Sequence, residues 1–307
     1  MKQFFVFREK LRSNQVVAVA LYTFSNLWVM LFSHTGRKIR AATTGVALCL
    51  RFRNEARYLE EWLEYHRAAG TDHFFLYNNF SNDNYLDVLK PWISRNLVTL
   101  IDWPKVPASP DAEEDCIRRA AGRFSWVGFI DADEFIVIGD GRSIGEFLAS
   151  FEGKPAVALH WRMFGSSWHK ERPAESVTIA YHLRAEKTNR HVKCFVRPEE
   201  VTACRNSHCF FYRKLGRAVT EHKHPVYGSV RVPASSGLAW INHYYCKSQE
   251  DYLLKTKQSS TLDRVGMRYP SRQMGKIAED MARNNEVSDT CAVEYFRKRT
   301  EKQMRSA

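Results

Sequence analysis

The chain has 307 residues, of which 44% are hydrophobic and 13% aromatic, so it can bury a sizeable core and is not a disordered polypeptide. Its formal net charge of +12 favours polyanionic partners, namely phosphates, nucleic acid or anionic lipid. The seven cysteines are an odd number without a Cys-x-x-Cys pair, which indicates reduced thiols in a reducing compartment. A zinc site at Cys204, His208 and Cys209 is the weaker interpretation, because no matching second pair exists.

Residues 1–40 differ from the rest and form an N-terminal extension. The stretch 16–32 is mostly apolar but contains Thr23, Ser25 and Asn26, which makes it marginal as a membrane-spanning helix. Basic residues flank it on both sides, and this suits a helix lying at a membrane interface as well as one that spans. From the sequence we expect either membrane association, on the cytoplasmic side, or a plain extension.

From residue 46 the chain alternates between predicted strands and helices. The spacing predicts strands at 46–52, 73–77, 98–103 and 126–130, with helices from an Asn54 N-cap to Gly70, at 85–93 and at 113–124. This alternation indicates an α/β fold with a doubly wound, mostly parallel sheet and helices on both faces. The second half is less regular, with expected strands at 156–164, 192–196 and 240–245, a helix at 248–257 and a helical tail from 281.

Polar clusters follow the ends of the predicted strands. They are Arg53-Asn54-Glu55, the turn 78–83, and Asp131-Ala132-Asp133. Ligands bind outside the carboxyl ends of the strands in sheets of this type, so we expect the three clusters to converge on one edge and form a site.

Asp131 and Asp133 stand two apart in the apolar run 129–137, where a strand would aim both side chains to the same side. Burying carboxylates is costly without a partner, and a divalent cation accepts two hard oxygens at once. Mg or Mn held by these groups and completed by phosphates would point to a diphosphate-containing substrate. A solvated strand end is the alternative.

A series of ordered motifs carries a family resemblance: residues 53–55 with 58–62 and 65–66, 72–74 with 77–79, 129–135, 161–169, 193–198, 242–244 with 247–248, and 285–287. Together they resemble the nucleotide-sugar glycosyltransferases of the GT-A fold, and within these the family 92 type with its bacterial relatives. The resemblance covers about residues 45–300. It implies one GT-A domain with a Rossmann-like sheet and an irregular, acceptor-side second half.

The resemblance also implies roles for individual residues. Asp131 and Asp133 would hold Mn or Mg, with His243 as a further ligand, a combination that suits Mn. Asp83 would bond a uracil or ribose, whereas Lys193 and Lys247 are either phosphate partners or ordinary surface lysines. The residues expected to bind the nucleotide sugar are Arg53, Asn54, Glu55, Asn78, Asn79, Asp83, Asp131, Lys193 and Lys247.

The implied reaction is transfer of a sugar to the hydroxyl of a glycan or lipid-linked acceptor. Inversion would need a carboxylate base, and Glu175 and Glu221 are our candidates among the second-half carboxylates, which also include Glu171 and Glu186. Trp168 stands where the family commonly has glycine, so it either stacks on a sugar or packs within its loop. The expected substrate residues are Trp161, Gly165, Ser166, Ser167, Trp168 and His169.

Two other functions compete with glycosyl transfer. A metal-dependent nucleotidyltransferase or phosphoester hydrolase would also place paired carboxylates at a strand end. A basic nucleic-acid-binding protein is disfavoured, because no predicted helix interleaves clustered basic residues with aromatics. We therefore expect no specific nucleic-acid partner.

Overall fold

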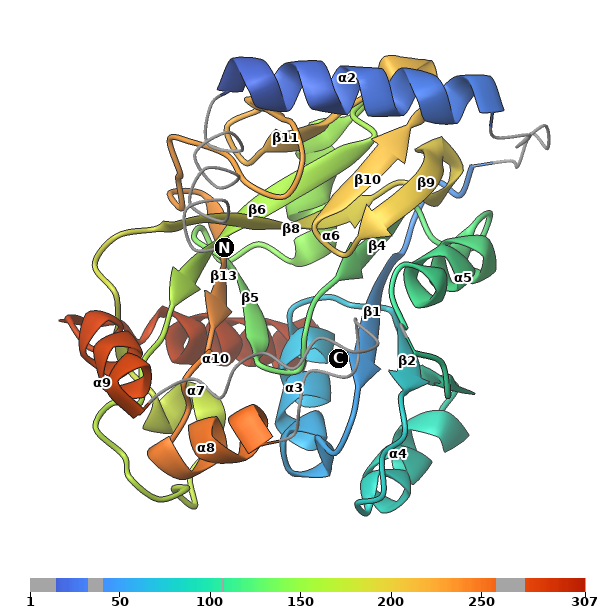
Figure 1. Ribbon diagram of the computed structural model, residues 1–307. Coiled ribbons are helices and arrows are strands. Elements are labelled where there is room, and N and C mark those ends of the chain that lie inside the picture. Colours follow the sequence, from blue (N-terminus) through green and yellow to red (C-terminus); the bar gives the residue numbers. More distant parts are fainter. Residues whose placement is uncertain (1–14, 33–40, 107, 258–273, 307) are drawn as a thin grey trace.

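The computed structural model describes residues 15–32, 41–106, 108–257 and 274–306 (Figure 1). Its first half is a parallel sheet in the order β3-β2-β1-β4, as the alternating pattern predicted. The strands are β1 (Val46–Phe52), β2 (His73–Asn78), β3 (Val98–Asp102) and β4 (Trp126–Phe129). The connecting helices are α3 (Ala56–Ala68), α4 (Tyr85–Ser94) and α5 (Asp111–Ala120).

The second half extends the same sheet with mixed strand directions. Strand β8 (Asn189–Val196) lies antiparallel between β4 and β6 (Ala156–Met163). Beyond β6 come β11 (Ala218–Thr220), which is parallel to it, and β12 (Pro225–Val226). Strand β13 (Ala239–His243) pairs in parallel with β6 and antiparallel with β5 (Glu134–Ile138). The predicted α/β fold with a mostly parallel, Rossmann-like sheet is confirmed.

Smaller elements complete the chain. Two short sheets pair β9 (Val201–Asn206) with β10 (Cys209–Tyr212), and β7 (Leu183–Arg184) with β14 (Val287–Ser288). The remaining helices are α2 (Gln15–Phe32), α6 (Ile144–Leu148), α7 (Val177–Ala180), α8 (Gln249–Lys257), α9 (Met274–Arg283) and α10 (Cys291–Ser306), with 3₁₀ turns η1 (Ala149–Phe151), η2 (Pro198–Glu200) and η3 (Arg213–Leu215).

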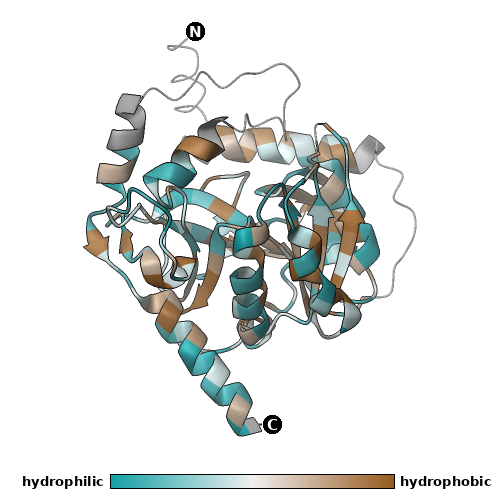
Figure 2. Cartoon of the chain, turned by 90° about the horizontal axis from the view of Figure 1, so that it is seen from below, coloured by the Kyte–Doolittle hydropathy of each residue, from teal (hydrophilic) through white to brown (hydrophobic). Residues whose placement is uncertain are grey.

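Alternate residues of β1 pack into two different hydrophobic cores, one on each face of the sheet. Leu48 and Leu50 pack with Trp62 of α3, while Ala47 and Cys49 pack on the opposite face with α5 and the β9-β10 hairpin. This period-2 alternation places helices on both faces of the sheet, as predicted. The outer helices carry both hydrophilic and hydrophobic residues, and the last turns of α10 project from the body (Figure 2).

Helix α2 lies across the end of the molecule beside β9, β10 and η3 (Figure 1). No helix in the described part of the chain has the length and apolar character needed to cross a membrane. The basic residues that flank residues 16–32 lie outside the described residues. All seven cysteines are free, as expected, and six of them are buried.

Two local predictions are wrong. Asn54 is not the N-cap of α3: it adopts a left-handed φ of 56°, and Glu55 occupies the cap position without a side-chain bond. Asp131 and Asp133 do not share a strand, since β4 ends at Phe129 and β5 begins at Glu134. The chain leaves its partner β1 and joins β13 at this point, so the two aspartates lie in the intervening turn.

Candidate active site

The side chains of Trp62, on α3, and of Glu134 both hold the turn between β4 and β5 in place. The indole Nε1 of Trp62 lies 3.1 Å from the carbonyl oxygens of both Asp131 and Glu134. The backbone N–H of Asp131 donates to Oε2 of Glu134 at 2.9 Å. The aspartates therefore occupy a fixed turn at the carboxyl end of β4, the edge at which ligands bind in such sheets.

Lys193 of β8 reaches this turn from the antiparallel strand. Its side chain is only 1% exposed, and its Nζ lies 2.9 Å from Oδ2 of Asp131 and 3.6 Å from Oε2 of Glu134. The hydroxyl of Ser207, in the β9-β10 turn, lies 3.2 Å from the same nitrogen. Lys193 is thus a buried cation tied to the predicted site, and the surface-lysine alternative is wrong for it.

The charged groups in this cluster shift one another's pKa values. Burial alone would lower the pKa of Lys193, but the carboxylates of Asp131 and Glu134 outweigh it and raise that pKa. Partial burial also acts to raise the pKa of the half-exposed Asp131, yet the Lys193 ammonium holds that pKa below its ordinary value. The carboxyl of Glu134 is completely buried, and this raises its pKa to about 7 despite the attraction of Lys193. Lys193 and Asp131 are therefore a charged pair.

Two of the three predicted metal ligands approach each other. His243, the last residue of β13, places Nε2 at 3.5 Å from Oδ1 of Asp133. Its Nδ1 lies 3.9 Å from Oε1 of Glu134, and neither of these two buried atoms has a hydrogen-bond partner in the described part of the chain. Imidazole beside carboxylates with unsatisfied polar atoms fits Mn or Mg.

The third predicted ligand, Asp131, is engaged by Lys193. Consistent with this, the described residues contain no group of three or more His, Cys, Asp or Glu side chains arranged to hold a metal ion. Asp131 keeps a half-exposed side chain, 49% accessible. A metal at this turn would meet Asp133 and His243 close together and Asp131 already bound to Lys193.

The loops after β1 and β2 interlock, as the predicted convergence requires. The backbone N–H of Asn54 donates to Ser81 at 3.0 Å, and that of Asn82 donates to the Asn54 amide oxygen at 2.8 Å. Asp83 accepts from the N–H of Ala56 at 2.8 Å and so caps α3 in place of Asn54. The other Asp83 oxygen, Oδ1, is buried without a hydrogen-bond partner among the described residues.

Asn78 and Asn79 serve these loops structurally. The Asn78 amide donates to Tyr85 and Asp102, and the Asn79 amide donates to the carbonyl oxygens of Trp103 and Lys105. Both amide nitrogens are thereby occupied in holding the strand ends together.

Lys247 joins the donor-side loops to the second half of the chain. Its Nζ lies 3.5 Å from the ring centroid of Tyr58 and 3.7 Å from Oε2 of Glu55. Arg53 and Glu55 are partly buried in the same loop after β1, and Lys247 itself is buried. Lys247 is therefore a second buried lysine on this edge, so the surface-lysine alternative is wrong here too.

The predicted substrate loop 165–169 is fastened to the segment before β14. The amide of Asn285 accepts from the N–H of Ser167 at 2.9 Å and donates to Ser166 at 3.3 Å. A Cβ on Gly165 would lie 2.1 Å from the Asn285 amide oxygen, so only glycine fits there. His169 anchors the far end of the loop, its Nε2 lying 3.1 Å from the carbonyl of Ala180.

Two tryptophans are among the predicted substrate residues. Trp161 is ringed by His191, His208 and His243, with ring centroids at 5.4, 5.3 and 4.5 Å. Trp168 has a left-handed φ of 67° and is 65% exposed, so it does not pack within its loop. The loop-packing interpretation of Trp168 is wrong, and sugar stacking stays a prediction.

The two candidate bases have different surroundings. Glu175 is exposed in the loop before α7. Glu221 follows β11 and is 2% exposed, and neither carboxylate oxygen has a hydrogen-bond partner among the described residues. The imidazole Nε2 of His222 lies 3.7 Å from Oε1 of Glu221.

Three residues of the site were not predicted from the sequence. Glu134 braces the turn, Ser207 contacts Lys193, and Arg51 lines a small pocket beside Asp131 together with Ser207. The sequence could have indicated Glu134 as a site residue, since it extends the acidic pair inside an apolar run. Nothing in the sequence indicates Ser207, because only the β9-β10 hairpin brings it to Lys193.

The comparisons with known proteins cover the part of the chain that forms this site. The family model described as glycosyltransferase family 92 matches residues 45–305. A family 92 protein of Oryza sativa subsp. japonica is 31% identical over 211 residues, covering 67% of this chain and 34% of the relative. One of Ricinus communis is 31% identical over 204 residues, covering 65% and 35%. The chain spans about a third of the length of these relatives.

Solved structures of similar fold include Staphylococcus aureus TarS residues 1–349 with UDP-GlcNAc, with a TM-score of 0.39 and 9% identity over 85% of this chain and 73% of that one. A mannosyltransferase of Pyrobaculum calidifontis in complex with GDP-Man and Mn²⁺ gives a TM-score of 0.32 and 18% identity over 49% and 45%. Because the family model matches most of the chain, including every strand of the site, the protein belongs to glycosyltransferase family 92.

Proposed function

We propose that this protein is a metal-dependent glycosyltransferase that moves a sugar from a nucleotide-diphosphate sugar to an acceptor hydroxyl with inversion. The observation that carries the proposal is the approach of Asp133 to His243 at 3.5 Å, next to the ion pair of Lys193 and Asp131. Family membership supports the reaction class, and the interlocked donor-side loops support a nucleotide partner.

Asp133 and His243, with Asp131, would hold Mn or Mg at the turn between β4 and β5. The bound ion would neutralise the negative charge that grows on the departing diphosphate. Lys193 holds Asp131 in position and contributes a fixed positive charge on the same edge. The buried Oδ1 of Asp83, which has no hydrogen-bond partner among the described residues, supports binding of the nucleoside there.

The acceptor would bind on the side of Trp161 and Trp168. An exposed indole offers an apolar face to a sugar ring, and the rigid loop 165–169 fixes its position. The acceptor hydroxyl must lose a proton as it attacks, which assigns the role of base to a carboxylate. Glu221 and Glu175 are the candidates, and a glycan or a lipid-linked sugar is the proposed acceptor class.

A thermal-shift screen tests donor binding. The protein is mixed with Mn²⁺ and UDP-, GDP- or CDP-sugars, and one class is expected to raise the melting temperature, because a ligand of the native state stabilises it. Asp131→Asn and Asp133→Asn should lose this shift. Asp140→Asn is the matched control, since Asp140 is an exposed carboxylate paired with Arg142. A full shift in Asp133→Asn would refute the metal assignment.

Product analysis tests the reaction itself. Release of a nucleoside diphosphate together with a glycosylated acceptor supports transfer. Release of pyrophosphate or a nucleoside monophosphate would instead identify a nucleotidyltransferase or a phosphoester hydrolase, and would overturn the proposal.

A further inference from the structure

Helix α2 carries its polar and apolar residues on unexpected sides. Tyr22 and Asn26 are buried against the protein, whereas Phe24 is 67% and Trp28 57% exposed. A surface helix normally turns its apolar stripe toward the core. The exposed large apolar residues recur at helical spacing along one side: Leu21, Phe24, Leu27 and Trp28.

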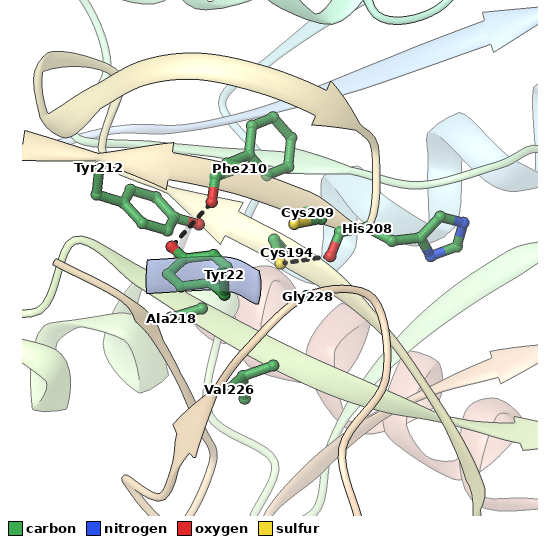
Figure 3. Close-up of a pocket in the computed structure, with 9 residues that line it drawn as sticks. All are labelled: Tyr22, Cys194, His208, Cys209, Phe210, Tyr212, Ala218, Val226 and Gly228. Carbon is green, nitrogen blue, oxygen red and sulfur yellow. Dashed lines mark hydrogen bonds between the residues drawn. The ribbon is translucent and has the colours of Figure 1, made fainter. Parts of the chain in front are cut away.

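The orientation of α2 is fixed by specific contacts. The hydroxyl of Tyr22 donates to the carbonyl of Phe210 at 3.0 Å, and its ring lies 5.6 Å from that of Phe211. Figure 3 shows Tyr22 placed over the β10 strand beside Tyr212 and Cys209. The amide of Asn26 lies 3.4 Å from the carbonyl of Gly216. The apolar stripe therefore faces away from the protein.

Basic residues lie near this helix. Gln15–Phe32 contains no charged residue, but β9 and η3, which contact α2, expose Arg205 and Lys214, and Arg217 is exposed two residues after η3. The sequence on either side of the helix adds further basic residues, which fall outside the described part: Lys2, Arg8, Lys10, Arg12, Arg37, Lys38 and Arg40. Apolar side chains rimmed by lysine and arginine match the headgroup and acyl layers of an anionic membrane.

We propose that α2 lies flat on an anionic lipid surface, with Leu21, Phe24, Leu27 and Trp28 inserted among the acyl chains. The described residues hold no helix able to span a bilayer, so the contact is interfacial. A second copy of the chain is disfavoured as the occupant, because the same face would bring two basic rims together. The proposal is independent of the reaction proposed above.

This placement leaves the donor site accessible. Strands β1 and β2 run away from α2, so their carboxyl ends lie on the side of the sheet remote from the helix (Figure 1). The loops after these strands contain the residues expected to bind the nucleotide sugar. The membrane would hold the opposite end of the domain.

Vesicle flotation of the full chain tests the proposal. Wild type should float with phosphatidylcholine vesicles that contain phosphatidylglycerol, and less with phosphatidylcholine alone. Phe24→Ser/Trp28→Ser should weaken binding by about tenfold or more, since two exposed side chains no longer insert. Ile179→Ser/Met304→Ser is the matched control, because both of these apolar residues are exposed elsewhere, and it should bind as wild type does.

A charge variant separates the two parts of the surface. Arg205→Glu/Lys214→Glu should weaken binding to the anionic vesicles by about fivefold or more and leave binding to neutral vesicles unchanged. Melting temperatures within about 2 °C of wild type confirm that the variants fold. Undiminished flotation of Phe24→Ser/Trp28→Ser would overturn the proposal. So would a concentration-dependent dimer that the same variant abolishes, because a second copy would then cover the stripe.

Discussion

Replacing Lys193 by methionine removes a buried ammonium while keeping an apolar stem of similar length. In the native structure this ammonium lies 2.9 Å from Asp131 and 3.6 Å from Glu134. Its loss leaves Glu134 completely buried and without its nearest cation. The variant should therefore be less stable, and the defect should arise from uncompensated carboxylates rather than from a cavity.

The magnitude follows from the burial of each partner. Removing one member of a buried ion pair costs about 3 to 5 kcal/mol. Asp131 is half-exposed, so water screens part of the loss, and we expect the lower end, about 3 kcal/mol. For a chain of this size, that corresponds to a melting temperature lower by about 5 °C.

Differential scanning calorimetry at pH 8, where Glu134 is mostly ionised, measures this effect. Adding Glu134→Gln to Lys193→Met should restore a large part of the lost stability, because the buried carboxylate is then neutral. Lys187→Met, at an exposed lysine, is the control and should melt as wild type does. If Lys193→Met melts within about 2 °C of wild type, or if Glu134→Gln lowers its stability further, the electrostatic account is wrong.

Three further predictions concern other parts of the structure. Burial lowers the pKa of His66 to about 3, far below its value in the unfolded chain. The unfolded chain therefore takes up the proton first, and the free energy of unfolding falls as pH drops from about 6.5 toward 3. In urea titrations, His66→Gln should reduce the slope of the unfolding free energy against pH by up to about 1.4 kcal/mol per pH unit. Gly128→Ala would place a Cβ 2.5 Å from the Phe195 ring, and chemical denaturation should show a loss of about 1 to 3 kcal/mol, whereas an unchanged midpoint would contradict the packing. Trp168→Ala should leave the melting temperature unchanged, because the ring is exposed, but lower kcat/KM by about tenfold in the transfer assay; unchanged kinetics would exclude a sugar contact.

The parallel half of the fold was predictable because its signals are local. The apolar run of β1, the helical spacing of Leu59, Trp62 and Leu63, and the polar turn after β2 each specify their own element. Alternation then fixes parallel pairing, and parallel pairing brings the strand ends together. The end of β4 was located for the same reason, although the two aspartates lie in the turn after this strand and not in a strand themselves.

Features that depend on distant partners were not predictable in this way. The sequence around Lys193 does not reveal that its ammonium is buried, because its partner Asp131 lies 62 positions away and Ser207 comes from another hairpin. Asn54 has the residue type of an N-cap, but Asp83 takes that role from the neighbouring loop. Tertiary contacts thus decided between residues that were equally suitable locally.

The contacts of Asn285 tie the chain after α9 to the loop 165–169. Asp289, four residues later, binds Arg162 at 3.0 Å and also pairs with Arg184, so the same short segment secures the end of β6 and strand β7. The loop bearing Trp168 is therefore clamped by residues more than a hundred positions away in the sequence. A truncation designed to trim the helical tail would remove the contacts of both Asn285 and Asp289 if it began before residue 285, and would keep both only if it began within α10.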